Sequence, residues 1–221
     1  MTNTPYHFYP IWDPLLRALH WWNAVMVALQ IVTGSIMLIF GEEIPDAMLK
    51  SLANIHGVSG YMFAAGLFAR ILWLFIGPAT ASWRDLLPLT SSQRKTITDT
   101  LRYYFSFLRG TPPLYKAHNS FAGIIYFLFF IIAGIQVVTG VIILNMQEDL
   151  RENSPLLEWH EFGYALIILY IIAHVFAVFV HEFVERHNLI SSMIHGSKTF
   201  TEEEWQKLTS MEKGSAGGID N

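Results

Sequence analysis

Nine histidines and no cysteine define the metal chemistry that is open to this chain of 221 residues. Without cysteine we expect no disulfide, no thiolate-ligated zinc, no iron–sulfur cluster and no covalently attached c-type haem. A metal would have to be held by histidine, methionine or oxygen. Four histidines, His20, His56, His160 and His174, fall within or beside long apolar stretches. An ionisable side chain is costly in such a setting, so these four are functional candidates.

His160 and His174 are separated by 14 residues. At 100° per residue this interval falls about 40° short of four helical turns, so both imidazoles project from nearly the same face of a helix. The rise of 1.5 Å per residue places them about 21 Å apart along the axis. One helix therefore presents two imidazoles at two heights.

The helices that position these residues are predicted to span a membrane. Hydrophobic side chains make up 52% of the chain and charged ones 14%, against roughly 45–50% and about 25% in soluble domains. Four apolar stretches, residues 19–40, 52–76, 121–144 and 162–180, are long enough to cross a bilayer, which takes about 20 helical residues. Asp13 and Pro14 predict the start of the first helix, and no basic segment precedes it, so we expect no cleaved signal peptide.

The distribution of lysine and arginine predicts the orientation of the spans. Basic residues gather in the connection 77–117 and in the C-terminal tail, whereas acidic residues dominate the connections 41–51 and 145–158. The basic residues are Arg84, Arg94, Lys95, Arg102, Arg109 and Lys116 in the connection and Arg186, Lys198, Lys207 and Lys213 in the tail. Both termini and the middle connection are therefore expected on the cytoplasmic side, and the two acidic connections outside.

The chain is expected to form one membrane domain over residues 1–200 and a charged cytoplasmic tail, frayed at its end, over 201–221. Within the middle connection, apolar residues recur at helical spacing and predict an amphipathic helix over about 91–109, either on the membrane surface or as a solvated linker. These apolar residues are Ile97, Leu101, Tyr104, Phe105 and Leu108. We expect no internal repeat and no second soluble domain.

The expected depths of the four histidines in the membrane group them into two pairs across the bundle. His56 and His160 lie near the outer ends of their spans, and His20 and His174 lie in the inner half. Two pairs of imidazoles, one above the other, are typical of a transmembrane cytochrome with two non-covalent b haems. Because two imidazoles fill both axial positions of the iron, such sites suit electron transfer rather than substrate binding. The predicted fold is an all-α, four-helix membrane bundle that encloses two b haems.

Two further residues, Gly34 and Arg70, each lie 14 positions after one of the histidines, His20 and His56. Gly34 follows His20 and would let a flat macrocycle approach the helix backbone opposite the outer pair. Arg70 follows His56 and could neutralise a haem propionate at the inner pair.

Other histidines offer alternatives. His181 lies seven residues beyond His174 on nearly the same face and competes with it as an inner ligand, although it would place that site at the membrane edge. A single histidine at a helix end is also often an interfacial residue rather than a ligand. His7, His187 and His195 lie outside the spans and are expected to be solvated.

His118 and Asn119 stand where the middle connection enters the third span. A quinone headgroup needs hydrogen bonds to its carbonyl oxygens and protons on reduction, and histidine and asparagine can supply the hydrogen bonds. Asn119 could equally be the N-cap of the third span. Both interpretations stay open.

From Trp12 to about Phe200 the sequence resembles the b-type cytochrome subunits of membrane-bound nickel–iron hydrogenases. These belong to a wider group of dihaem cytochromes that includes membrane subunits of formate dehydrogenase and thiosulfate reductase. The resemblance rests on Arg17-Ala18-Leu19-His20-Trp21, Ile55-His56, Arg70-Ile71-Leu72-Trp73, His118-Asn119-Ser120, Thr139-Gly140, Trp159-His160, Ala173-His174-Val175 and residues 189–194.

The resemblance implies that His20, His56, His160 and His174 are the axial ligands and that His118 and Asn119 contact a quinone. It further implies the cytoplasmic membrane of a bacterium or archaeon. Electrons would come from hydrogenase small and large subunits, or a similar iron–sulfur oxidoreductase, and reduce menaquinone or ubiquinone. Quinone reduction is the only chemistry expected on this chain, and no nucleic-acid partner is expected.

Alternative functions are the cytochrome subunit of a formate dehydrogenase or thiosulfate reductase, a stand-alone quinone-linked cytochrome, a proton transporter that uses a histidine relay, and a haem-free anchor for a soluble enzyme. The anchor leaves the stacked histidines unexplained.

Overall fold

A computed structural model describes residues 6–110, 112–151, 154–185 and 187–216, with the side chains of 148–149 and 212–216 left out. The chain divides into two compact units. We call residues 18–72 and 128–174 the histidine unit, and residues 1–17, 73–127 and 175–221 the terminal unit. Glu152, Arg186 and the glycine pair 217–218 lie outside the described residues.

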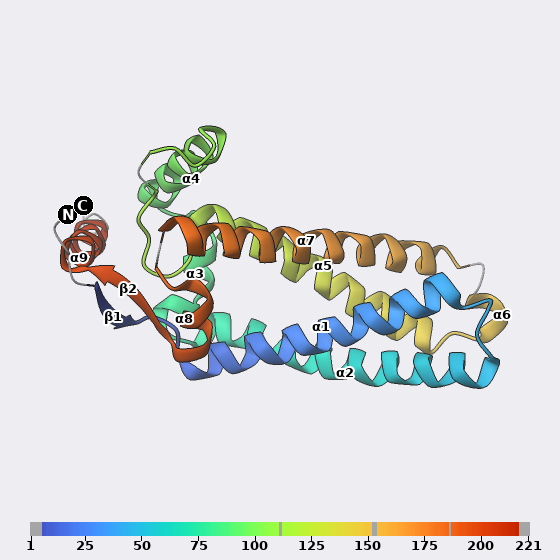
Figure 1. The fold of residues 1–221 in the computed structure, drawn as a ribbon. Coiled ribbons are helices and arrows are strands. Elements are labelled where there is room, and N and C mark those ends of the chain that lie inside the picture. Colours follow the sequence, from blue (N-terminus) through green and yellow to red (C-terminus); the bar gives the residue numbers. More distant parts are fainter. Residues whose placement is uncertain (1–5, 111, 152–153, 186, 217–221) are drawn as a thin grey trace. The chain divides into compact units, whose positions relative to one another are not determined.

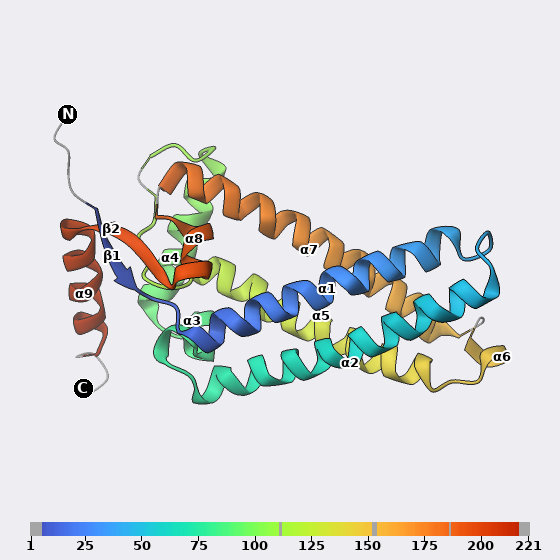
Figure 2. The same cartoon turned by 60° about the horizontal axis from the view of Figure 1, so that its bottom comes forward.

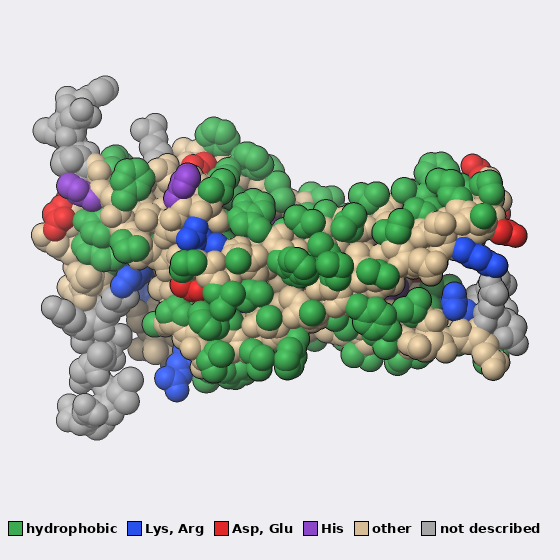
Figure 3. Space-filling model, turned by 90° about the horizontal axis from the view of Figure 1, so that it is seen from below, with side chains coloured by type: hydrophobic (Ala, Val, Ile, Leu, Met, Phe, Trp, Pro, Cys, Tyr) green, Lys and Arg blue, Asp and Glu red, His purple; other side chains and the backbone are tan. Residues whose placement is uncertain are grey.

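Four long helices, which supply most of the histidine unit, are α1 (Pro14–Phe40), α2 (Asp46–Ile76), α5 (Ser120–Leu144) and α7 (Pro155–Glu185). The short helix α6 (Glu148–Arg151) lies between α5 and α7. Each of the four long helices is long and apolar enough to cross a bilayer, as predicted. Within the histidine unit their segments run side by side (Figures 1 and 2) around a core that contains Met26, Phe63, Leu67 and Ile167. The helix faces turned away from this core carry many exposed hydrophobic side chains, which Figure 3 shows on one side of the molecule. Such faces suit contact with lipid tails.

The helices extend beyond the predicted apolar stretches, because helical geometry continues through polar and charged ends. The second helix begins at Asp46 rather than at residue 52, and the fourth covers Pro155–Glu185 rather than 162–180. The predicted start of the first helix is confirmed. Its first residue is Pro14, and the Leu16 amide donates to Asp13 Oδ1 at 2.9 Å, as at an N-cap.

The terminal unit joins the two ends of the chain. Strand β1 (Tyr6–Pro10) pairs antiparallel with β2 (Ser197–Thr201), with Phe8 opposite Thr199. Helix α8 (Leu189–His195) precedes β2, and α9 (Glu202–Ala216) follows it. Residues 201–216 thus form ordered structure where the sequence predicted a tail. Ile11, Trp12 and Phe200 belong to the core of this unit.

The middle connection also belongs to the terminal unit and contains three short elements, η1 (Ala79–Ala81), α3 (Trp83–Leu86) and α4 (Ser91–Phe105). Helix α4 lies where an amphipathic helix over about 91–109 was predicted, and it ends four residues early. The chain turns into the left-handed region at Phe107 and Leu108, where a helix cannot continue. Tyr103 and Thr100 face inward, whereas Phe105 is 83% exposed. Its placement on a membrane surface stays a prediction.

Candidate functional site

The histidine unit brings His56 of α2 and His160 of α7 together, with ring centroids 6.3 Å apart. Each imidazole Nδ1 has a threonine partner on a neighbouring helix. Thr33 Oγ1 of α1 lies 2.9 Å from His56 Nδ1, and Thr139 Oγ1 of α5 lies 2.8 Å from His160 Nδ1. The same pattern therefore occurs twice, once between α1 and α2 and once between α5 and α7.

These threonines determine which ring nitrogen of a neutral imidazole carries the hydrogen. The hydroxyl of Thr33 donates to the Leu29 carbonyl at 2.7 Å, and that of Thr139 donates to the Ile135 carbonyl at 2.8 Å. With its hydrogen committed to the backbone, each hydroxyl oxygen must accept a hydrogen bond from Nδ1–H of its histidine. In the neutral imidazole this places the hydrogen on Nδ1 and leaves the Nε2 lone pair for a metal.

A glycine follows each threonine and gives the histidine room. A Cβ atom placed on Gly34 would lie 3.5 Å from His56 Cε1, and one on Gly140 would lie 3.1 Å from His160 Cε1. The prediction that Gly34 lies at the outer pair agrees with this geometry. At Gly140 the distance is tighter than ordinary side-chain packing, so a larger residue would push the imidazole away.

The two threonines were missed in the sequence analysis, although a signal is present. Residues 30–34 read Gln-Ile-Val-Thr-Gly and residues 136–140 read Gln-Val-Val-Thr-Gly. The threonine and the glycine of this short motif make the same contacts on α1 and α5. In its first copy the Gln30 amide also donates to the His56 carbonyl at 2.7 Å.

The inner pair consists of His20 of α1 and His174 of α7, with ring centroids 6.5 Å apart. Tyr170, one turn earlier on α7, stacks on His174 at 5.7 Å with an interplanar angle of 10°. Two metal–imidazole bonds of about 2 Å each, plus the distance from each nitrogen to its ring centre, add up to about 6 Å. Both histidine pairs therefore have the separation of two axial ligands on one iron.

His181 has a different environment. Its Nδ1 lies 2.6 Å from Glu185 Oε1, and its Nε2 lies 2.7 Å from the hydroxyl of Tyr104. Protein partners occupy both ring nitrogens, so the geometry favours His174 over His181 as the inner ligand. Among the other histidines, His7 and His195 are exposed as expected. The expectation that His187 is solvated is wrong, because the side chain is buried among groups of the terminal unit.

Arg70 is only 8% exposed, and its guanidinium carbon lies 5.7 Å from the ring centre of Phe130. A guanidinium at this position has the charge and shape to bind a haem propionate.

His118 and Asn119 occupy different environments in the terminal unit. The Asp85 carboxylate pairs with His118 Nδ1, and the His118 ring lies between Trp12 and Tyr126, with centroids at 4.8 and 5.5 Å. Asn119 Oδ1 accepts from the Phe121 amide at 2.9 Å, as an N-cap does, and Asn119 Nδ2 donates to Thr100 at 3.1 Å. Asn119 therefore has a structural role at the start of α5, whereas the contact of His118 with Asp85 involves Nδ1.

The geometry defines a membrane helical bundle with paired imidazoles of the kind that binds haem, and comparison with known proteins agrees. A model of the prokaryotic cytochrome b561 family matches residues 11–196, and the chain belongs to this family. It is a multi-pass membrane cytochrome of the b type, a class that binds haem b.

Several curated relatives are similar over most of their length. A probable Ni/Fe-hydrogenase B-type cytochrome subunit of Cupriavidus necator is 26% identical, over 86% of each chain. The protein of that name in Azotobacter vinelandii is 26% identical over 87% of this chain and 89% of its own. A probable Ni/Fe-hydrogenase 1 B-type cytochrome subunit of Escherichia coli K12 is 21% identical over 86% and 90%.

Proposed function

We propose that this cytochrome holds two haems, one between His56 and His160 and one between His20 and His174, and passes electrons through them to a quinone. The observation that carries this proposal is the presence of two imidazole pairs, each with the separation of axial ligands, within one apolar helical unit. Two bis-histidine haems supply two one-electron carriers that do not readily bind dioxygen.

The residues around the pairs have separate roles. Thr33 and Thr139 hold the outer imidazoles in the tautomer that binds iron. Gly34 and Gly140 leave space beside those imidazoles. Arg70 binds a propionate at the inner site. The protein thus contributes ligands, orientation and an apolar environment, and no residue of the haem sites acts as a chemical catalyst.

The electron donor is proposed to be a nickel–iron hydrogenase, because the relatives are named as its cytochrome subunits. Similar iron–sulfur oxidoreductases are the alternative donors. The charge bias of the connections supports an orientation with both termini inside and the acidic connections outside a bacterial or archaeal cytoplasmic membrane. The donor would then deliver electrons at the outer pair, and the inner pair would pass them to menaquinone or ubiquinone.

His118 is the proposed quinone-binding residue. The Asp85 carboxylate accepts a hydrogen bond from His118 Nδ1 and orients the ring, so that Nε2 can meet a quinone oxygen. Asn119 fixes the start of α5 beside it and supports the site through Thr100.

Replacing His118 with leucine should slow quinone reduction while leaving the haems in place. We expect a fall of about a hundredfold or more in the rate at which decylubiquinone oxidises the dithionite-reduced protein in vesicles, because a hydrogen-bond and proton partner of the quinone is lost. Stopped-flow absorption of the haems measures this rate, and a haem assay checks their content. His195→Leu is the control, because His195 is exposed in the same unit. Unchanged quinone reduction in His118→Leu would reject this site.

A further inference from the structure

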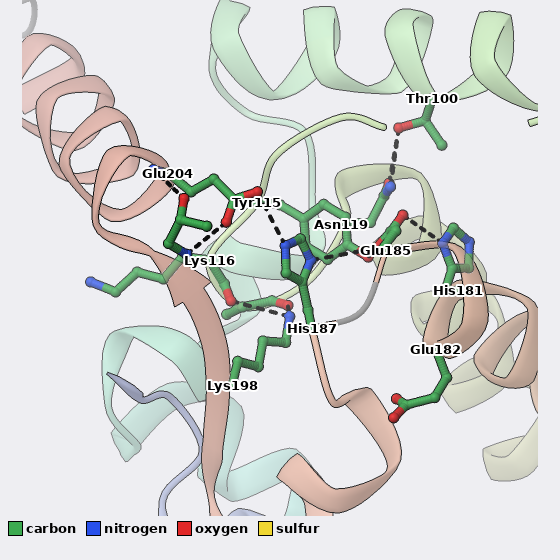
Figure 4. Close-up of polar contacts among 12 residues, drawn as sticks. Thr100, Tyr115, Lys116, Asn119, His181, Glu182, Glu185, His187, Lys198 and Glu204 are labelled. Carbon is green, nitrogen blue, oxygen red and sulfur yellow. Dashed lines mark hydrogen bonds and ion pairs between the residues drawn. The ribbon is translucent and has the colours of Figure 1, made fainter. Parts of the chain in front are cut away.

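A connected series of titratable side chains, which we call the relay series, is buried in the terminal unit. At its centre lies Glu185, whose side chain is only 1% exposed. Its Oε1 accepts from His181 at 2.6 Å, and its Oε2 accepts from the hydroxyl of Tyr115 at 2.9 Å. Figure 4 shows Glu185 between His181 on one side and His187 on the other. Buried carboxylates and imidazoles are costly, and the electron-transfer sites do not use these groups.

One end of the relay series reaches water. His187 Nδ1 lies 3.9 Å from Glu185 Oε2, and His187 Nε2 lies 3.6 Å from Glu204 Oε1. The side chain of Glu204 is 34% exposed, whereas that of His187 is 9% exposed. A small movement of the imidazole would bring either carboxylate within hydrogen-bond distance. Exposure therefore falls stepwise from Glu204 through His187 to Glu185.

The other end approaches the proposed quinone site. His181 Nε2 pairs with the hydroxyl of Tyr104 at 2.7 Å, and the Tyr104 ring lies 6.0 Å from that of Phe121. Phe121 directly follows the start of α5, where Asn119 binds Thr100, one turn before Tyr104 on α4. Tyr104 thus stands beside the residues that shape the His118 site.

We propose that Glu204, His187, Glu185, His181 and Tyr104 form a proton relay that carries protons from water to the quinone. The inference rests on the proposed quinone function and adds the route of its protons. Reduction of one quinone to a quinol takes two electrons, which the reduced haems supply, and two protons. For each proton, the Tyr104 hydroxyl gives its hydrogen to a quinone oxygen and regains one from Nε2–H of protonated His181. Glu185 and His187 then return a proton to His181 from Glu204 and water.

The charges around the relay series suit proton transfer. Burial, followed by the Glu185 carboxylate, raises the pKa of Tyr104 to about 12, so at neutral pH Tyr104 rests as a neutral donor. Burial lowers the pKa of His187 despite its two carboxylate neighbours, so this imidazole is ready to accept a proton from the water side. Lys198 is buried on β2, and burial lowers its pKa to about 8 against the influence of the Glu185 and Asp85 carboxylates. Tyr103 and Tyr115 also lie near Glu185, and burial, followed by the Glu185 carboxylate, raises the pKa of each. Tyr126 is a further titratable group that acts on Tyr104 and Tyr115.

A purely structural role for the same contacts is the main alternative. Glu204 also caps α9, because its Oε2 accepts from the Thr201 amide at 2.8 Å while Thr201 Oγ1 accepts from the Glu204 amide. The test must therefore use readouts that a loss of packing would not change in the same way.

The relay can be tested with the full-length, haem-loaded protein in vesicles, reduced with dithionite and oxidised by decylubiquinone. His181→Gln and Tyr104→Phe keep the size of each side chain and remove the transferable proton. We expect each variant to keep its haem spectrum and its KM for the quinone, and to lose about tenfold or more in rate between pH 6 and 8. Added imidazole should restore part of the rate, and the solvent deuterium isotope effect should rise.

His195→Gln is the matched control, because His195 is an exposed histidine of the same unit outside the chain of contacts. Wild-type rates, pH profile and isotope effect in both variants would overturn the relay while leaving the proposed function intact. A slow rate that imidazole does not restore, with a raised KM, would overturn it in favour of a structural role. A haem-loaded wild-type protein that fails to reduce the quinone would refute the proposed function and the relay together.

Discussion

Replacing His174 with alanine should remove the inner haem and leave at least part of the outer one. The variant loses one of the two imidazoles of the inner pair and the ring on which Tyr170 stacks. The outer pair lies about 21 Å away along α7 and has its own ligands and threonine partners. We expect about half of the haem to remain, because a b haem without one axial imidazole is held only weakly.

A haem assay together with reduced-minus-oxidised spectra measures this effect. His181→Ala is the matched control, because it removes a histidine seven residues further along the same helix. The control should keep both haems, since its imidazole is bonded to Glu185 and Tyr104. If His174→Ala retained both haems equally, or if His181→Ala lost one, His181 would be the inner ligand instead of His174.

Replacing Gly140 with leucine should abolish the outer haem. Even a Cβ atom at this position would lie 3.1 Å from His160 Cε1, so the longer side chain must displace the imidazole from its place opposite His56. The Thr139 bond to His160 Nδ1 would be lost with it. Loss of the outer haem should also stop electrons that enter from the outer side of the membrane.

Gly134→Leu on the same helix is the control, because no atom lies within 4 Å of a Cβ built there. This variant should retain both haems and their reduction potentials. Redox titration of the two variants separates the outcomes. If Gly140→Leu shows two haems with unaltered potentials, the space beside His160 has no part in haem binding.

Much of the architecture follows from local sequence properties. Helical periodicity and hydropathy identify four spans, and the 14-residue interval on α7 is enough to place His160 and His174 on one stripe. Chain order and depth then pair them with His56 and His20. A membrane span has a fixed length and rise, so position in the sequence converts directly into depth.

The remaining features depend on contacts between distant segments. The bonds from Thr33 and Thr139 to imidazole nitrogens join neighbouring helices, and only the repeated Gln-x-Val-Thr-Gly motif marks them in the sequence. The burial of His187 depends on the pairing of β1 with β2, which lie about 190 residues apart in the chain. A charged tail gives no local sign of that pairing. The early end of α4 is likewise not visible in the sequence, because the two residues that adopt a left-handed backbone there, Phe107 and Leu108, are not glycines.

The number and ligation of haems in the purified wild-type protein test the central claim most directly. Haem assay and electron paramagnetic resonance of the oxidised, full-length protein in mild detergent should show two low-spin, bis-histidine b haems per chain. A redox titration should resolve them as two one-electron carriers. A colourless protein from haem-replete cells, or a single haem per chain, would contradict the account.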